Sequence, residues 1–228
     1  MTRRLALLAL LAGALAGPAA TATRMPTLPL AGELGAATVV VRGAPDPDAR
    51  AMTVLHQFRR DFRRQIVFAE TRTTGADGRT WYRIRLSLRP NGQRGWIPAA
   101  VTSGLAPVRN RIEVRRDARR LEVWRGSTLL FRTKVAVGAP GMETPLGRFY
   151  VTARFVPDDS FLGSFALETS AYSKLSEWPG GGVVGIHGTS KPWLLGQAVS
   201  HGCIRVSNEA ALRLKALAPL GTPITISA

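Results

Sequence analysis

Residues 81–89 restrict the fold of this chain more than any other segment, because they alternate strictly between two kinds of side chain. One face carries Tyr82, Ile84, Leu86 and Leu88, and the other carries Arg83, Arg85, Ser87 and Arg89. A period of two residues predicts a half-buried β-strand, and the Asn91-Gly92 pair that follows predicts a hairpin turn. For the arginine face we favour a solvated strand surface over a dedicated binding site.

Short runs of β-branched and aliphatic residues continue along the chain, separated by Gly, Pro and charged turns. The predicted strands include residues 39–41, 95–98, 112–114, 121–124, 129–137, 149–152 and 224–226. A helix is predicted to begin at Glu209, with Asn208 as its N-cap, and to end before Pro219. The fold class is therefore mainly β, with one or two helices.

The first 22 residues have the pattern of a signal peptide. Arg3 and Arg4 precede an apolar run, residues 5–17, that is too short to remain as a membrane span, and small residues follow at 20–22. We expect export to the periplasm or the extracytoplasmic cell wall, with no stable membrane insertion after cleavage. Residues 1–22 are thus assigned to the signal peptide.

The remaining chain is expected to form two domains. The segment 102–107 is rich in small residues, Gly and Pro, so we assign residues 103–110 to a linker. This leaves residues 35–102 as a first, mostly antiparallel β-domain and residues 111–228 as a second, mainly β domain.

The charge of the chain bears on its partners. It carries 31 Lys and Arg against 15 Asp and Glu, a formal net charge of +16 that falls to +14 without Arg3 and Arg4. Acidic wall polymers are candidate partners for such a surface, although arginine-rich composition and ordinary solubility explain it equally well. The expected export and the lack of a recognition motif argue against nucleic acid as a binding partner.

Cys203, the only cysteine of the chain, lies in the segment Ser200-His201-Gly202-Cys203-Ile204-Arg205. Cysteines of exported proteins are usually paired, so a single thiol predicts a nucleophile. With a pKa near 8.5 the thiol needs a base, and His187, at the end of an apolar run, is a better candidate than His201. Gly202 permits a tight turn whose amides, at Gly202 and Cys203, could stabilise an oxyanion.

Other interpretations of these residues are less specific. A single cysteine is often inert packing, and histidines are often structural. Zinc would need a fourth ligand that the spacing does not supply, so we expect no metal, and the chemistry needs no cofactor. In papain-like enzymes the nucleophile precedes its histidine, whereas here His187 precedes Cys203 by sixteen residues.

This order, with the motifs around it, closely resembles the L,D-transpeptidase catalytic domain (the YkuD family) over residues 112–227. The matching segments are 144–149 (TPLGRF), 184–189 (VGIHGT), 200–205 (SHGCIR) and 221–226 (GTPITI). The resemblance implies a β-sandwich of the L,D-transpeptidase type with one or two helices. It also implies Cys203 as nucleophile, His187 as base and the Gly188 carbonyl as the group that orients the imidazole.

Further roles follow from the same resemblance. It implies an oxyanion hole made by the amides of His201, Gly202 and Cys203. Ser200 and Arg205 would support the turn or contact a substrate carboxylate, and Gly188 and Tyr172 are further candidate substrate-binding residues. Residues 155–182, with Tyr172, would form a lid or groove wall over Cys203, and the aromatic residues of this segment fit a core position as well as a substrate contact.

Residues 35–102 resemble a bacterial SH3-like domain. The resemblance depends on the Val-Arg-Gly-Ala-Pro turn at 41–45, the Trp81-Tyr82 strand and the Gly-Trp-Ile-Pro strand at 95–98. It implies a small β-barrel that binds wall peptides or positions a neighbouring enzyme. Residues 52–68 form a longer segment than such a core needs.

The L,D-transpeptidase resemblance implies a reaction on peptidoglycan stem peptides. Cys203 would attack the tetrapeptide stem, release D-alanine and form a thioester, which an acceptor amine would resolve to a 3→3 cross-link. Water as acceptor would make the protein an L,D-carboxypeptidase, and a protein lysine would make it an anchoring transpeptidase. A non-catalytic wall-binding protein is the competing class.

Overall fold

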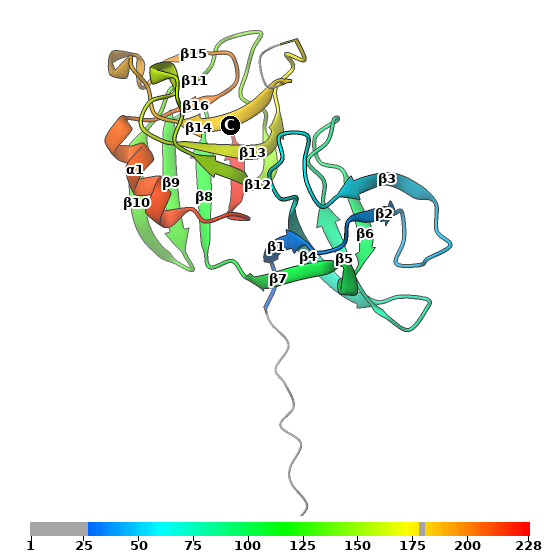
Figure 1. The fold of residues 1–228 in the computed structure, drawn as a ribbon. Coiled ribbons are helices and arrows are strands. Elements are labelled where there is room, and N and C mark those ends of the chain that lie inside the picture. Colours follow the sequence, from blue (N-terminus) through cyan, green and yellow to red (C-terminus); the bar gives the residue numbers. More distant parts are fainter. Residues whose placement is uncertain (1–26, 178–180) are drawn as a thin grey trace, which may run out of the picture.

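The computed structural model describes residues 27–177 and 181–228, and its strands form two large sheets (Figure 1). The mainly β class is confirmed. Within the described residues the single α-helix is α1 (Asn208–Leu217), which lies against the second sheet. The expected signal peptide, residues 1–22, lies outside the described residues.

The first sheet has seven strands in the order β3-β2-β6-β5-β4-β1-β7, all paired antiparallel. A short 3-10 helix, η1 (Ala99–Val101), precedes the last strand. The core of the first sheet is built from alternate strand positions, among them Val41, Ile84 and Ile97. That this unit is a small SH3-like barrel stays a prediction. The strands are β1 (Leu30–Leu34), β2 (Thr38–Arg42), β3 (Ala51–His56), β4 (Ile66–Thr74), β5 (Thr80–Arg85), β6 (Arg94–Pro98) and β7 (Thr102–Pro107).

The second sheet has eight strands in the order β10-β9-β8-β17-β12-β13-β14-β16, with parallel pairing at β8–β17 and at β14–β16. Two short strands, β11 and β15, pair in parallel beside it. The elements are β8 (Asn110–Arg115), β9 (Arg120–Arg125), β10 (Thr128–Lys134), β11 (Val137–Gly138), β12 (Gly147–Phe155), η2 (Ser160–Leu162), β13 (Ala166–Tyr172), β14 (Val183–His187), η3 (Pro192–Leu194), β15 (Ala198–Ser200), β16 (Ile204–Arg205) and β17 (Pro223–Ser227).

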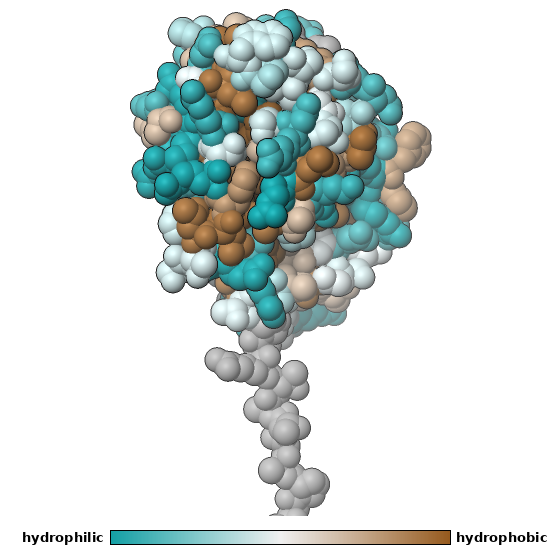
Figure 2. Space-filling model, turned by 90° about the vertical axis from the view of Figure 1, so that its left-hand side faces the viewer, coloured by the Kyte–Doolittle hydropathy of each residue, from teal (hydrophilic) through white to brown (hydrophobic). Residues whose placement is uncertain are grey.

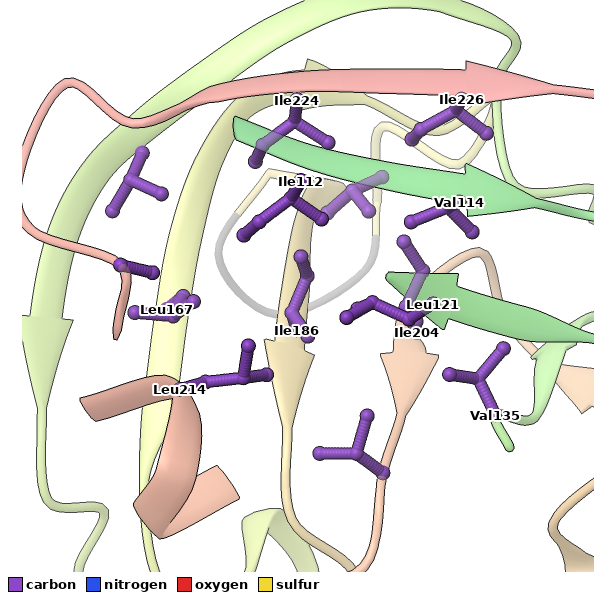
Figure 3. Packing of buried hydrophobic residues seen from close by; sticks show 14 of the residues in the cluster. Ile112, Val114, Leu121, Val135, Leu167, Ile186, Ile204, Leu214, Ile224 and Ile226 are labelled. Carbon is purple, nitrogen blue, oxygen red and sulfur yellow. The ribbon is translucent and has the colours of Figure 1, made fainter. Parts of the chain in front are cut away.

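One aliphatic cluster holds the second sheet together (Figure 3). Ile112 and Ile224 enter it from the paired strands β8 and β17, and Leu214 enters it from α1. Ile186 and Ile204, opposite each other on β14 and β16, are also members. Each such buried side chain contributes about 1.5–3 kcal/mol, so the positions of β14 and β16 are strongly fixed.

The segment 103–110 is not a linker. Its first part belongs to β7, which pairs with β1, so that the first sheet begins at Leu30 and ends at Pro107. The residues that suggested a linker make an irregular strand pair instead: Gly104 adopts a φ of +63°, and a side chain on Gly32 would lie 2.6 Å from the Ser103 carbonyl oxygen. Val108 and Arg109 then lead directly into β8.

The arginine face of β5 does not face solvent at Arg85. This side chain is buried, forms an ion pair with Glu70 and donates a hydrogen bond of 2.7 Å to the carbonyl of Arg148 in β12. Arg89 likewise donates to the Ser173 carbonyl at 2.7 Å. These side chains face the second sheet, so the contact between the two sheets covers that part of the face.

Aromatic packing completes the contact between the sheets. Phe68 of β4 stacks on Tyr150 of β12 with 5.2 Å between ring centroids, and the Tyr150 hydroxyl donates to the Ile66 carbonyl. Ala31 joins the same buried cluster. A buried contact of this kind gives the two sheets one relative position.

The predicted N-cap of α1 is wrong by one residue. Ser207 is the cap, and its hydroxyl accepts a hydrogen bond from the Ala210 amide. The Asn208 carboxamide is used elsewhere, because its Oδ1 accepts from the amides of Ser164 and Thr189. Asn208 therefore joins the helix to the segment that follows β14.

The surface on the side of the second sheet carries small apolar patches separated by hydrophilic side chains (Figure 2). Among the described residues, no helix is long and apolar enough to cross a membrane.

Candidate active site

The parallel pair β14–β16 places the predicted catalytic residues on one face of the sheet. Ile186 pairs with Ile204 and His187 pairs with Arg205, so Cys203 lies opposite Gly185. Because alternate strand residues share a face, His187, Cys203 and Arg205 lie on the side away from Ile186 and Ile204, which enter the core. Gly185 leaves room there: a side chain at this position would lie 3.6 Å from the His187 ring and 4.0 Å from the Cys203 sulfur.

The Cys203 thiol is partly exposed, and its sulfur accepts a hydrogen bond from the Gly185 amide at 3.4 Å. Burial raises the pKa of this thiol, while the Gly185 N–H and the Arg205 guanidinium act in the opposite direction. The thiol is therefore protonated at rest and needs a base when it attacks.

His187 is almost completely buried, with 2% of its surface exposed. Its Nδ1 lies 2.6 Å from the Gly188 carbonyl oxygen. A carbonyl can only accept, so Nδ1 carries the proton and Nε2 of the neutral ring keeps its lone pair. Burial lowers the pKa of His187 to about 4, the Gly188 carbonyl opposes that shift, and Arg205 adds to it. The ring is thus a neutral base at physiological pH.

A tight turn carries the nucleophile. Gly202 has a φ of +115°, and a side chain on it would lie 2.8 Å from Ser173. The Ser200 hydroxyl donates to the Cys203 carbonyl at 2.6 Å and accepts from the Gly202 amide at 3.2 Å. The Gly202 amide, one of the three expected in the oxyanion hole, is therefore engaged inside the turn.

Thr144 secures the same turn from outside, and no role was predicted for it. Its buried hydroxyl donates to the Gly202 carbonyl at 2.9 Å and accepts from the Gly138 amide at 2.9 Å. Thr144 begins the TPLGRF segment, whose resemblance to the family was the one signal in the sequence that could have singled it out.

The four predicted substrate-binding residues differ in position. Tyr172 lines the cavity that also contains Cys203 and His187. Ser200, Arg205 and Gly188 are buried, which leaves them roles in the turn, in the local electric field and in orienting His187. A direct substrate contact by these three residues stays a prediction.

Arg205 and His201 lie outside that cavity lining. The Arg205 guanidinium lies 4.9 Å from the centre of the Phe161 ring, and its Nε has no hydrogen-bond partner among the described residues. His201 is partly exposed and is not among the residues that line the cavity around Cys203. Of the two histidines, His187 has the position of a general base.

The cavity has a volume of about 910 Å³ and opens between the two sheets. Phe161, Leu162 and Tyr172 of the second unit form part of its wall. Arg59 and Arg60, from the loop between β3 and β4, form another part. Sequence reasoning noted the unusual length of this segment but did not connect it to the site. Within the described residues no three His, Cys, Asp or Glu side chains are grouped to hold a metal ion.

A buried neutral imidazole at the end of β14 and a protonated thiol directly before the neighbouring β16 are the groups of a thiol-dependent acyl-transfer site. Comparison with known proteins specifies the family. Residues 109–226 match the model of the L,D-transpeptidase catalytic domain, YkuD. The chain belongs to this family.

The sequence relatives agree with that assignment. YkuD of Bacillus licheniformis is 30% identical over 158 residues, which cover 67% of this chain and 90% of that protein. YkuD of Bacillus subtilis is 36% identical over 93 residues, covering 41% of this chain and 51% of that protein. A solved L,D-transpeptidase from Mycobacterium smegmatis is 19% identical, with a TM-score of 0.44 over 59% of this chain and 66% of that one. The assignment depends on the family model and on the sequence relatives.

Proposed function

We propose that this chain is a peptidoglycan L,D-transpeptidase that uses Cys203 as nucleophile and His187 as base. The observation that carries the proposal is that His187, the last residue of β14, and Cys203, directly before β16, line the same cavity in a chain of the L,D-transpeptidase family. The catalytic cysteine of such an enzyme exchanges one amide bond for another, so the reaction requires no energy-rich cofactor.

The first half of the reaction makes a thioester. Nε2 of His187 accepts the thiol proton as the sulfur of Cys203 attacks the carbonyl of the third stem residue. The backbone amides of His201 and Cys203, two of the three expected in the oxyanion hole, stabilise the resulting oxyanion. As the intermediate collapses, the amide bond to the terminal D-alanine breaks, and the imidazolium returns its proton to the departing amine.

The second half returns the enzyme to its starting state. An amine from a neighbouring stem attacks the thioester and gives a proton to His187, and the Cys203 sulfur leaves and is reprotonated. The new amide is a 3→3 cross-link. Water in place of the amine would give a tripeptide, and a protein lysine would give an anchored protein.

The remaining parts of the proposal concern location and the first unit. Residues 1–22 direct export, which brings the mature chain to its wall substrate. The first sheet acts as an SH3-like unit beside the catalytic domain, and the high positive charge favours acidic wall polymers.

The test is mass spectrometry of products after the mature protein is incubated with a disaccharide-tetrapeptide, with Cys203→Ala alongside. A dimer that lacks one D-alanine, formed only by the protein with the thiol, supports the transpeptidase. Tripeptide alone would assign the carboxypeptidase reaction. No D-alanine release by protein with a reduced thiol would contradict the proposal and favour a wall-binding protein.

A further inference from the structure

The loop of residues 57–65, between β3 and β4, is an ordered extension of the first sheet. The Arg59 amide donates to the Arg63 carbonyl at 2.8 Å, and the Gln65 amide donates to the Gln57 carbonyl at 2.8 Å. Phe62, at the tip, has a φ of +63° and is 87% exposed. In Figure 1 this cyan loop lies beside β13. Its residues Arg59, Arg60 and Asp61 line the cavity that contains Cys203.

Two arginines attach the loop to the second sheet. Arg59 lies 2.5 Å from a carboxylate oxygen of Glu168 in β13, and Arg63 lies 3.4 Å from the other. Asp61 pairs with both arginines, at 3.0 and 3.3 Å. The Arg63 guanidinium also lies 4.7 Å from the centre of the Phe155 ring. Within this cluster two positive charges and two negative charges compensate one another.

Arg60 is different from its neighbours. It lines the same cavity as Cys203 and His187, and it takes part in none of the ion pairs found among residues 27–177 and 181–228. The loop around it is fixed by Arg59 and Arg63, so its backbone position does not depend on a ligand. The cavity wall therefore presents one cation that the protein itself leaves uncompensated.

We infer that Arg60 is a specificity-determining residue that binds the free carboxylate of the second or the third residue of the stem peptide, an inference that rests on the proposed function. Stem peptides carry side-chain or α-carboxylates that a guanidinium can bind through two parallel N–H groups. Asp159, also in the cavity wall, carries the opposite charge, and its Oδ1 accepts a hydrogen bond from the Phe161 amide at 2.8 Å. The first unit thus contributes directly to the substrate site, and the enzyme should favour stems whose carboxylates are not amidated.

The test combines substitutions at Arg60 with singly amidated substrates. The substrates are a tetrapeptide stem and two versions of it, one amidated at the second residue and one at the third. The proteins are the wild type, Arg60→Gln, Arg60→Lys and the control Arg50→Gln. Arg50 is an exposed residue of the same unit that does not line the cavity.

We expect Arg60→Gln to lower kcat/KM on the free stem by about tenfold, mainly through KM, because a charge-assisted contact is lost. One amidated stem should be a correspondingly poor substrate for the wild type and should show no further loss with Arg60→Gln. Arg60→Lys should recover part of the activity, and Arg50→Gln should behave as the wild type.

Additive losses for both amidated stems, or equal kinetics for the Arg60 and Arg50 variants, would overturn the inference while leaving the transpeptidase assignment intact. A wild type that releases no D-alanine from any stem would refute the proposed function, and the inference with it.

Discussion

Aliphatic side chains hold β14 and β16 in place, whereas guanidinium groups hold the first sheet against the second. Ile186 and Ile204 enter a continuous core directly behind the catalytic face. At the contact between the sheets, Arg85 and Arg89 instead donate to backbone carbonyls of the partner unit. Apolar packing has no direction, but hydrogen bonds do, so the second arrangement fixes an orientation.

The aliphatic core and the arginine contacts therefore have two separate tasks. The core determines where Cys203 and His187 lie relative to each other, and the arginine contacts determine where the 57–65 loop lies relative to both. Changes on the catalytic face should therefore alter the chemical step, and changes at the contact should alter stability and substrate binding. The following predictions test that separation.

The largest effect is expected for Cys203→Ala, which removes the nucleophile. Turnover of a disaccharide-tetrapeptide should be abolished, while the thermal midpoint of unfolding should change little because the thiol is partly exposed. Chromatographic assay of D-alanine release measures the first quantity. Retained turnover would show that Cys203 is not the nucleophile.

His187→Gln should lower kcat by a factor of about 10²–10⁴, because the thiol loses its base. The matched control is His201→Gln, which should keep most of the activity since His201 does not line the cavity. Pre-steady-state acylation rates distinguish the two. If the His201 variant were the slow one, the base would have to be reassigned.

Arg85→Met should lower the free energy of unfolding by about 1–3 kcal/mol, because Glu70 and the Arg148 carbonyl lose a buried donor. Arg79→Met, at an exposed ion pair with a distance of 3.9 Å, should stay within about 0.5 kcal/mol of the wild type. Urea unfolding measures both. Equal changes in the free energy of unfolding for the two variants would mean that the interactions of Arg85 do not stabilise the packing of the two sheets.

Thr144→Val should lower kcat several-fold and cost about 1 kcal/mol of stability, because the Gly202 carbonyl and the Gly138 amide lose their partner. Thr144→Ser keeps the hydroxyl and should retain kcat. KM should stay nearly constant in both variants, which steady-state kinetics can verify. A valine variant with normal kcat would exclude a positioning role.

The smallest expected effect is that of moderate acidification on kcat/KM. With a pKa of about 4, His187 remains a neutral base far below 6.5, so kcat/KM for acylation should fall only as the pH approaches 4. Stability should decline earlier, as the pH falls from about 6.5 to about 4, because the unfolded histidine binds the proton more readily. A half-maximal acidic limb near 6.5 would contradict the buried, neutral imidazole.

The local pattern was sufficient to predict most strands and to single out Cys203 and His187, which line the same cavity. Alternation predicted the buried side of β5, and the SHGCIR segment pointed to the turn at Gly202. The choice of His187 depended on its place at the end of an apolar run, which the structure shows as the last residue of β14.

Contacts between distant segments could not be predicted in the same way. Gly104 and Pro107 have the composition of a linker, and only pairing with β1 turns that segment into β7. The burial of Arg85 and the approach of Arg60 to the cavity depend on how the two sheets meet. The hydrophobic periodicity of a single strand does not indicate how two sheets pack against each other.

The most direct test of the account is the intact mass of the protein during turnover of a disaccharide-tetrapeptide. A covalent adduct equal to the donor minus one D-alanine, located on Cys203 by peptide mapping and absent from Cys203→Ala, is the predicted result. Turnover without such an adduct, under conditions that trap thioesters, would contradict covalent catalysis by Cys203.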